Sequence, residues 1–262
     1  MSFSAPSRAR DSGAKIIDEL KTDMKVLAVD TSTPTGSIAL LEGDTLLAEV
    51  AGTSTQTHAQ RLMPAIDAIL DMAGLTIGEC DGFAVTTGPG SFTGLRIGIS
   101  TVKGLGFATK KPIAAVSTLD ALTYQFPSFP NLVCPVLDAR KGQIYTALYE
   151  CIGHLKWKTV IEDCAVEPRE WLKQIQQLCL FVGEGATVYQ ELIREILGNL
   201  AQFAPSYLNR VRASVVAHIG MKQITDGETA DIESLVPHYV RKSDAEIKLE
   251  KGGLLTNVPR KI

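Results

Sequence analysis

The stretch KVLAVDTSTPTGSIALLEGDTLLAEV, residues 25–50, decides the fold. It opens with an apolar strand that ends in an acid, Lys25–Asp30, and continues with two further strands, Ser37–Leu41 and Thr45–Val50. Apolar residues then recur on one helical face over Thr57–Met72, which predicts a helix. Three antiparallel strands followed by a helix begin an α/β unit with a mixed sheet.

The same order of elements occurs twice along the chain. Strands at Gly82–Thr87 and Ile113–Val116, each followed by a helix, complete the first half. After the PSFPN stretch at 127–131, a second apolar strand ending in an acid, Leu132–Asp138, restarts the pattern. Both halves therefore predict three strands, helix, strand, helix, strand and helix. This order resembles the actin-like ATPase (ASKHA) architecture, an α/β fold of two RNase H-like lobes with mixed sheets and flanking helices.

The composition excludes several classes of protein. Lys and Arg total 26 against 29 Asp and Glu, so the basic excess typical of a main nucleic-acid contact is missing. No stretch approaches the roughly 18 apolar residues of a membrane span. The five cysteines contain no CxxC pair, and the four histidines lie far apart in the sequence. We therefore expect a cytoplasmic protein without a disulfide framework, a metal site or another cofactor.

Four residues are candidates for a nucleotide site. Asp30 and Asp138 end equivalent strands in the two halves, and in an actin-like ATPase such positions face the nucleotide. Gly183 and Gly185 lie at a strand-to-helix turn, where a backbone can approach a phosphate or an adenosine closely. The commoner use of each Asp is to cap its own turn, and this interpretation is favoured. Most turns with a GxG sequence are likewise only turns.

The glycine-rich loop at residues 88–94 is not a phosphate loop, because no Gly-Lys-Ser/Thr ends it. The predicted helix that follows, Thr93–Thr109, contains Gly98, Gly104 and Gly106. Three interior glycines cost a helix about 3 kcal/mol relative to alanine, so some close packing must offset the loss. Small residues recur at helical spacing, at Gly94, Gly98, Thr101 and Ala108. This stripe can pack on the protein's own sheet or on a partner subunit, and the pattern alone favours neither.

Six runs of sequence are similar to those of the TsaB family, also called YeaZ. They are VLAVDTSTPTGSIAL at 26–40, THAQRLMPAIDAIL at 57–70, GPGSFTGLRIGIS at 88–100, PVLDARKGQIYTALY at 135–149, VGEGA at 182–186 and PHYVR at 237–241. The GPGSFTGLRIG run is highly specific to that family. The similarity covers residues 24–241 and leaves out both ends of the chain.

The resemblance implies a function. TsaB proteins are non-catalytic activators in the synthesis of threonylcarbamoyladenosine, a modification beside the anticodon of tRNAs. The catalytic transfer belongs to the paralogue TsaD, which carries a paired-histidine metal site, and the small ATPase TsaE joins the complex. A homodimer is implied when TsaD is absent, and contact with tRNA is only indirect. Where the catalytic paralogue carries paired histidines, this sequence offers only His58.

The resemblance also places the partner interface on the two predicted helices, which favours the second use of the glycine stripe. The interface residues expected are Leu62, Ile66, Ile69, Gly94, Leu95, Gly98, Ile99, Thr101 and Val102. No catalytic residue is expected. Two alternatives remain: an ATPase or kinase with its own nucleotide site at Asp30 and Asp138, and, less favoured, a metalloprotease of the glycoprotease type.

The domain boundaries follow from the same reading. Residues 1–23 are expected to be a tail, 24–126 the first lobe and 131–212 the second. The segment 213–241 holds a final helix that returns to the first lobe, as the resemblance implies, and residues 242–262 form a second tail.

Overall fold

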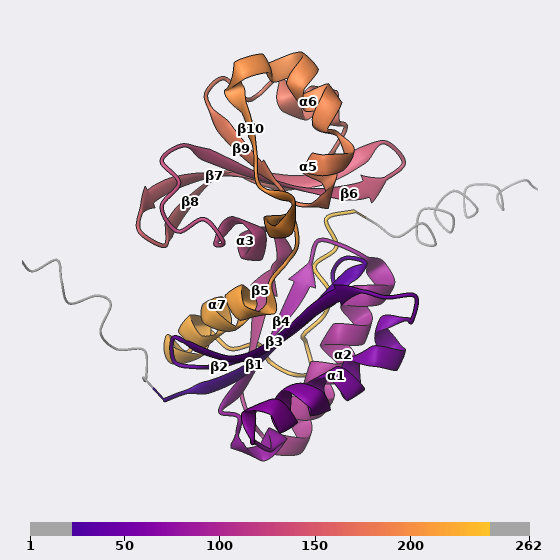
Figure 1. Cartoon of the computed structure of the whole chain (residues 1–262), viewed down its shortest axis with the longest axis vertical. Helices are drawn as coiled ribbons and strands as arrows, with labels where there is room; N and C mark the ends of the chain where they lie inside the picture. The colour runs from indigo at the N-terminus through magenta and orange to yellow at the C-terminus, as the bar shows by residue number, and fades with distance from the viewer. Residues whose placement is uncertain (1–22, 242–262) are drawn as a thin grey trace, which may run out of the picture.

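The computed structural model describes residues 23–241 of the chain, and these form two lobes, each built around a five-stranded mixed sheet (Figure 1). The predicted tails at 1–23 and 242–262 lie outside the described residues, apart from Asp23. The two-lobed actin-like α/β fold expected from the sequence is confirmed.

The first sheet has the strand order β3-β2-β1-β4-β5. Its strands are β1 (Lys25–Asp30), β2 (Thr35–Glu42), β3 (Thr45–Thr53), β4 (Gly82–Gly88) and β5 (Ile113–Ser117). Antiparallel pairs join β1 to β2 and β2 to β3, while β4 lies parallel to both β1 and β5. The meander therefore occupies one side of the sheet and the strands reached through crossover connections occupy the other.

The second sheet repeats this topology with the order β8-β7-β6-β9-β10. Its strands are β6 (Leu132–Arg140), β7 (Gln143–Gly153), β8 (Lys156–Val166), β9 (Cys179–Val182) and β10 (Ala201–Phe203). The strand that starts each half lies in the centre of its sheet. Asp30 and Asp138 therefore lie on equivalent central strands, at or near the end of each.

Two long helices cover one face of the first sheet. They are α1 (His58–Ala73) and α2 (Phe92–Thr109), which run side by side in Figure 1. Helix α1 starts within one residue of the prediction, where the Thr57 backbone N–H donates to Oε1 of Gln60 at 3.0 Å. Helix α7 (Ala213–Thr225) packs on the same sheet against β1, β2, β4 and β5, so the last helix of the second half lies on the first lobe.

A hydrophobic core crosses from one lobe to the other. It includes Val26 and Ala84 of the first sheet, Leu122 of the short helix α3 (Thr118–Thr123), and Val133 and Leu180 of the second sheet. The remaining helices are α4 (Pro168–Leu172), α5 (Glu184–Val188), α6 (Gln190–Leu197) and the one-turn helices η1 (Ile77–Glu79), η2 (Gly198–Leu200) and η3 (Ser206–Leu208). Among the described residues, we find no helix with the length and apolar character that a membrane crossing requires.

Candidate functional site

The turn after β1 holds a fully buried carboxylate. Oδ1 of Asp30 accepts three hydrogen bonds, from the backbone N–H of Ser32 at 3.1 Å, from the Ser32 hydroxyl at 2.6 Å and from the Thr86 hydroxyl at 2.7 Å. Oδ2 of Asp30 has no hydrogen-bond partner in the described part of the chain. Burial raises the pKa of Asp30 to about 6, although the three hydrogen bonds act in the opposite direction. Asp30 thus caps its own turn, the commoner of its two candidate roles.

The glycine-rich signature packs directly on this turn. Thr31 Oγ1 donates to the Gly94 carbonyl at 2.8 Å, and the Ser91 N–H donates to the Ser32 carbonyl at 2.6 Å. A Cβ at Gly94 or at Gly98 would overlap an oxygen of Thr31. The loop and the first turns of α2 can therefore rest on the β1–β2 turn only because side chains are missing there. The sequence held both motifs, but nothing in it indicated that they touch.

The side chains expected at the partner interface lie inside the first lobe, which corrects that expectation. Leu62, Ile66, Ile69, Leu95, Ile99 and Val102 are each at most 3% exposed, and Thr101 is half-buried. Gly94 and Gly98 pack against Thr31 as described, and a Cβ at Gly106 would lie 2.7 Å from Cδ1 of Ile113. Internal packing, the other interpretation of the stripe, therefore holds for these residues. The apolar periodicity of the two helices therefore marked the faces that pack on the core of the lobe.

The opposite faces of α1 and α2 are exposed and carry few charges. On α1 the exposed residues include Met63, Pro64, Asp67, Ala68, Asp71 and Met72, and on α2 they include Arg96, Ser100, Gly104, Phe107 and Ala108. We call these eleven residues the α1–α2 face. Met72 and Phe107 are 70% and 78% exposed, large values for apolar side chains. A Cβ at Gly104 would meet nothing within 4 Å. Exposed apolar surface of this kind is typical of an interaction site.

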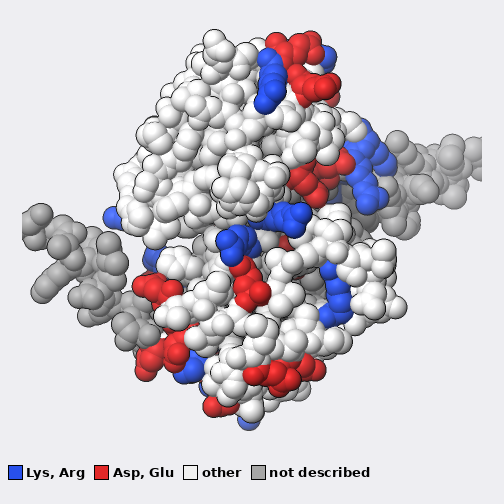
Figure 2. Space-filling model, viewed as in Figure 1, with Lys and Arg blue, Asp and Glu red and all other residues white. Residues whose placement is uncertain are grey.

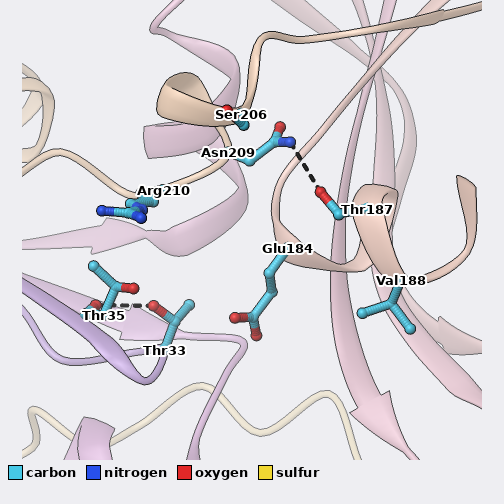
Figure 3. Close-up of a pocket in the computed structure, with 8 residues that line it drawn as sticks. All are labelled: Thr33, Thr35, Glu184, Thr187, Val188, Ser206, Asn209 and Arg210. Carbon is cyan, nitrogen blue, oxygen red and sulfur yellow. Dashed lines mark hydrogen bonds between the residues drawn. The ribbon is translucent and has the colours of Figure 1, made fainter. Parts of the chain in front are cut away.

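A pocket of about 320 Å³ opens between the lobes (Figure 3). Its lining residues are Thr33 and Thr35 from the first lobe and Glu184, Thr187, Val188, Ser206, Asn209 and Arg210 from the second half of the chain. Asn209 organises one wall, because its Oδ1 accepts from the Gly183 N–H and its Nδ2 donates to the Thr187 hydroxyl, both at 3.1 Å. The Glu184 carboxylate points into the space between Thr33 and Val188 in Figure 3.

Two neighbouring carboxylates act on Glu184 at this cleft. Burial raises the pKa of Glu184, and the charges of Asp138 and Asp30 raise it further, while Arg140 opposes them. Asp138 is exposed, and its Oδ1 accepts the Arg140 N–H at 2.8 Å, so it too caps its own turn. The structure thus brings the two predicted acids near a third, Glu184, which the sequence reasoning missed. Its only signal was its place between two glycines.

The two glycines of that turn serve packing. Gly183 has a φ of 103°, in the region that favours glycine, and a Cβ there would overlap the Val136 carbonyl. A Cβ at Gly185 would lie 2.9 Å from the carbonyl carbon of Leu137. Both glycines therefore let α5 lie against β6. They thereby hold Glu184 at the cleft.

His58 is committed to local hydrogen bonds. Its Nδ1 lies 3.0 Å from an Arg61 guanidinium nitrogen, which can only donate, so Nδ1 accepts and Nε2 carries the proton. Nε2 then donates to the Thr33 carbonyl at 3.0 Å. Burial lowers the pKa of His58, and the positive charge of Arg61 lowers it further. The hydrogen bond to the Thr33 carbonyl acts in the opposite direction. In residues 23–241 no group of three or more His, Cys, Asp or Glu side chains is arranged to hold a metal ion.

Charges on the visible surface are mixed. Figure 2 shows Lys and Arg side chains at the seam between the lobes, next to acidic ones, and wide uncharged areas elsewhere. A nucleic-acid backbone would require a continuous basic surface. This view of the molecule shows no such surface.

Two lobes of identical topology around a cleft define a protein with the actin-like fold. The family model described as "TsaD: tRNA N6-adenosine threonylcarbamoyltransferase" matches residues 45–249. A Bacillus subtilis protein named tRNA threonylcarbamoyladenosine biosynthesis protein TsaB is 35% identical over 86% of this chain and 97% of its own length. The Escherichia coli protein of the same name is 29% identical over 86% and 98%. The structure titled "YeaZ from Pseudomonas aeruginosa" superposes with a TM-score of 0.70 at 28% identity, over 82% of this chain and 99% of that one.

The chain belongs to the TsaB (YeaZ) family. The resemblance seen in the sequence is thereby confirmed, and it extends over nearly the whole length of the relatives.

Proposed function

We propose that this protein is the non-catalytic subunit that activates threonylcarbamoyl transfer to the adenosine beside the anticodon of tRNAs, in the cytoplasm. It acts by pairing with the catalytic paralogue TsaD, and TsaE joins the complex. The names of relatives that align over 97% and 98% of their own lengths support this role. The α1–α2 face is the observation that carries the pairing, because it is the exposed side of the two helices that the resemblance selects.

The residues at the cleft support a role without chemistry of its own. A paired-histidine metal site needs two imidazoles with free ring nitrogens, whereas both nitrogens of His58 are hydrogen-bonded to Thr33 and Arg61. Asp30 is held by Ser32 and Thr86, with the glycine-rich loop packed over its turn. These contacts favour an architectural use of the residues that an enzyme would use for catalysis.

The same face serves a homodimer when TsaD is absent. A two-fold pairing uses one patch on both copies, so self-association and partner binding compete. Flat, small residues such as Ser100, Gly104 and Ala108 let helix backbones approach closely, and Met72 and Phe107 supply apolar area. Burying two such side chains contributes roughly 1.5–3 kcal/mol each, which is enough to matter for a complex.

Gly104→Leu tests the proposal. The new side chain enters open space in the monomer but stands where a partner helix would lie. We expect association with TsaD and with a second copy to fall at least tenfold, measured by ultracentrifugation and by titration with purified TsaD. The fold should survive, since leucine is about 0.8–1 kcal/mol better than glycine in a helix. Gly153→Leu in the second lobe, where a Cβ would meet nothing closer than 3.8 Å, is the matched control. Unchanged association of the Gly104 variant contradicts the proposed interface.

A second candidate function, an ATPase or kinase, draws on Glu184 at the cleft and on the two acids near it, Asp30 and Asp138. The test is a nucleotide titration with turnover measurement on the isolated chain. We expect no measurable ATP hydrolysis, and turnover that disappears in Glu184→Gln would establish the enzyme instead.

A further inference from the structure

The chain returns to the first lobe after α7 and runs along it. We call residues 228–241 the C-terminal strap. The Ala230 N–H donates to the Ile113 carbonyl at 2.8 Å, beside the edge strand β5. Lys103 Nζ on α2 donates to the carbonyls of Glu233 and Leu235, at 3.3 and 3.2 Å. Leu235 is buried in the core beneath α1 and α2. These contacts fasten the first part of the strap to the first lobe.

An aromatic anchor holds the strap on the first turn of α2. The ring of Tyr239 stacks on that of Phe92, with centroids 4.6 Å apart and planes inclined by 22°. The Tyr239 hydroxyl accepts from Arg96 Nε at 2.9 Å, and the Arg96 guanidinium lies 3.9 Å above the Phe92 ring. Stacking, a hydrogen bond and a cation–π contact thus link Tyr239, Phe92 and Arg96 to one another.

His238, next to this anchor, bridges the two lobes. Its backbone N–H donates to the Thr87 carbonyl of the first lobe at 2.7 Å. Its carbonyl oxygen packs against Gly88, where an added Cβ would lie only 2.6 Å from that oxygen. Its ring Nε2 lies 2.7 Å from Oδ2 of Asp163, on β8 of the second lobe. Three residues further on, Arg241 donates to Oε1 of Gln143 on β7 at 3.1 Å.

We propose that the C-terminal strap is a latch that sets the angle between the two lobes, with the His238–Asp163 contact as its closing point. The lobes are joined covalently by residues 124–131 and 204–212, and within residues 23–241 the strap adds a crossing held by the side-chain contacts of His238 with Asp163 and of Arg241 with Gln143. A crossing of that kind can open without unfolding either lobe. Opening it would change the width of the cleft at Glu184.

Distances between the lobes test the latch directly. Spin labels at Glu79→Cys in the first lobe and Glu170→Cys in the second report the angle, on a background with Cys151→Ser and Cys164→Ser, since the three other cysteines are buried. Labelled full-length chain is diluted into unlabelled chain so that only distances within one molecule are recorded. We expect His238→Ala and Asp163→Asn each to raise the ratio of open to closed molecules about two- to fivefold, the effect of losing one solvent-exposed His–carboxylate hydrogen bond.

Three comparisons make the result decisive. His218→Ala removes another His–Asp pair, His218 with Asp44, which lies within the first lobe, and it should leave the distance distribution unchanged. The His238→Ala/Asp163→Asn double variant should match either single variant, since both remove one contact. Unchanged distances in both single variants would overturn the latch. Faster amide exchange in the strap at unchanged distances would also overturn it, because the strap would then be attached without holding the lobes.

Discussion

Replacing Asp30 with Asn should stabilise this protein at neutral pH. Asp30 is fully buried, and all three of its hydrogen bonds go to Oδ1, which an Asn carbonyl oxygen can keep. Folding raises the pKa of Asp30 from 3.8 to about 6, so the folded protein holds a proton that the unfolded chain has already released in this range. The carboxylate therefore costs stability as the pH rises from about 4 to about 6, and the full cost remains above that.

The size of the effect follows from the shift. About two pKa units correspond to about 3 kcal/mol of penalty at pH 7.5. The Asn Nδ2 would take the place of Oδ2, which has no partner, and an unpaired buried amide costs about 1–2 kcal/mol. Asp30→Asn should therefore be about 1–2 kcal/mol more stable than the parent at pH 7.5 and less stable than the parent at pH 4.

Urea unfolding followed by circular dichroism at pH 4, 5, 6 and 7.5 measures this difference. Asp67→Asn, at an exposed position on α1, is the control and should stay within about 0.5 kcal/mol at every pH. A difference between Asp30→Asn and the parent that does not change between pH 4 and pH 6 would refute the reasoning, because it would show that Asp30 does not titrate differently in the two states.

Two further predictions concern packing around the first sheet. Gly98→Ala should lower the free energy of unfolding by about 2–4 kcal/mol because the methyl group displaces Thr31 and its buried hydrogen bond, whereas Gly104→Ala should raise it by about 1 kcal/mol. Equal effects of the two in urea unfolding would contradict this contrast. Glu49→Gln should cost about 1–2 kcal/mol at pH 7 because the Gln amide nitrogen would replace Oε2, which accepts from the Arg212 guanidinium, whereas the Gln carbonyl oxygen can keep the bonds that Oε1 accepts from the Ser214 N–H and hydroxyl, at 3.0 and 2.7 Å. Although burial opposes it, hydrogen bonding from Arg212 and Ser214 lowers the pKa of Glu49, so the loss should shrink as the pH falls below about 4.5; a loss independent of pH would count against this.

The order of strands and helices was predictable because local sequence patterns indicate each element in both halves of the chain. Apolar strands ending in Asp30 and Asp138, and a capping box at Thr57, fix where elements begin and end without any long-range information. The duplication then selects the topology, since two equal series of strands and helices restrict the sheets that can form.

The cleft was less predictable because its residues meet only through tertiary structure. Glu184 lies far along the chain from Asp30, and no local rule marks the residue between two glycines as the one that faces a cleft. The bridging role of His238 was hidden for the same reason, since it depends on Thr87 and Asp163 from opposite lobes. Residues that meet only in the tertiary structure produce no periodic pattern in the sequence.

The interior glycines of α2 lower its intrinsic stability, as the sequence indicated, but most of the packing that offsets this loss lies on the face of α2 that points into the lobe and not on the face expected for a partner. A helix advances about 100° per residue, so Gly104 lies about 120° around the axis from Gly98. The two therefore cannot serve one surface. The loss at Gly98 is offset by close contact with the Thr31 turn, and that at Gly106 by contact with Ile113. At Gly104 no described residue lies close enough to offset a loss of about 1 kcal/mol. A partner backbone packed on the α1–α2 face would supply that contact, which is why Gly104, and not Gly98, is the position where association should be tested.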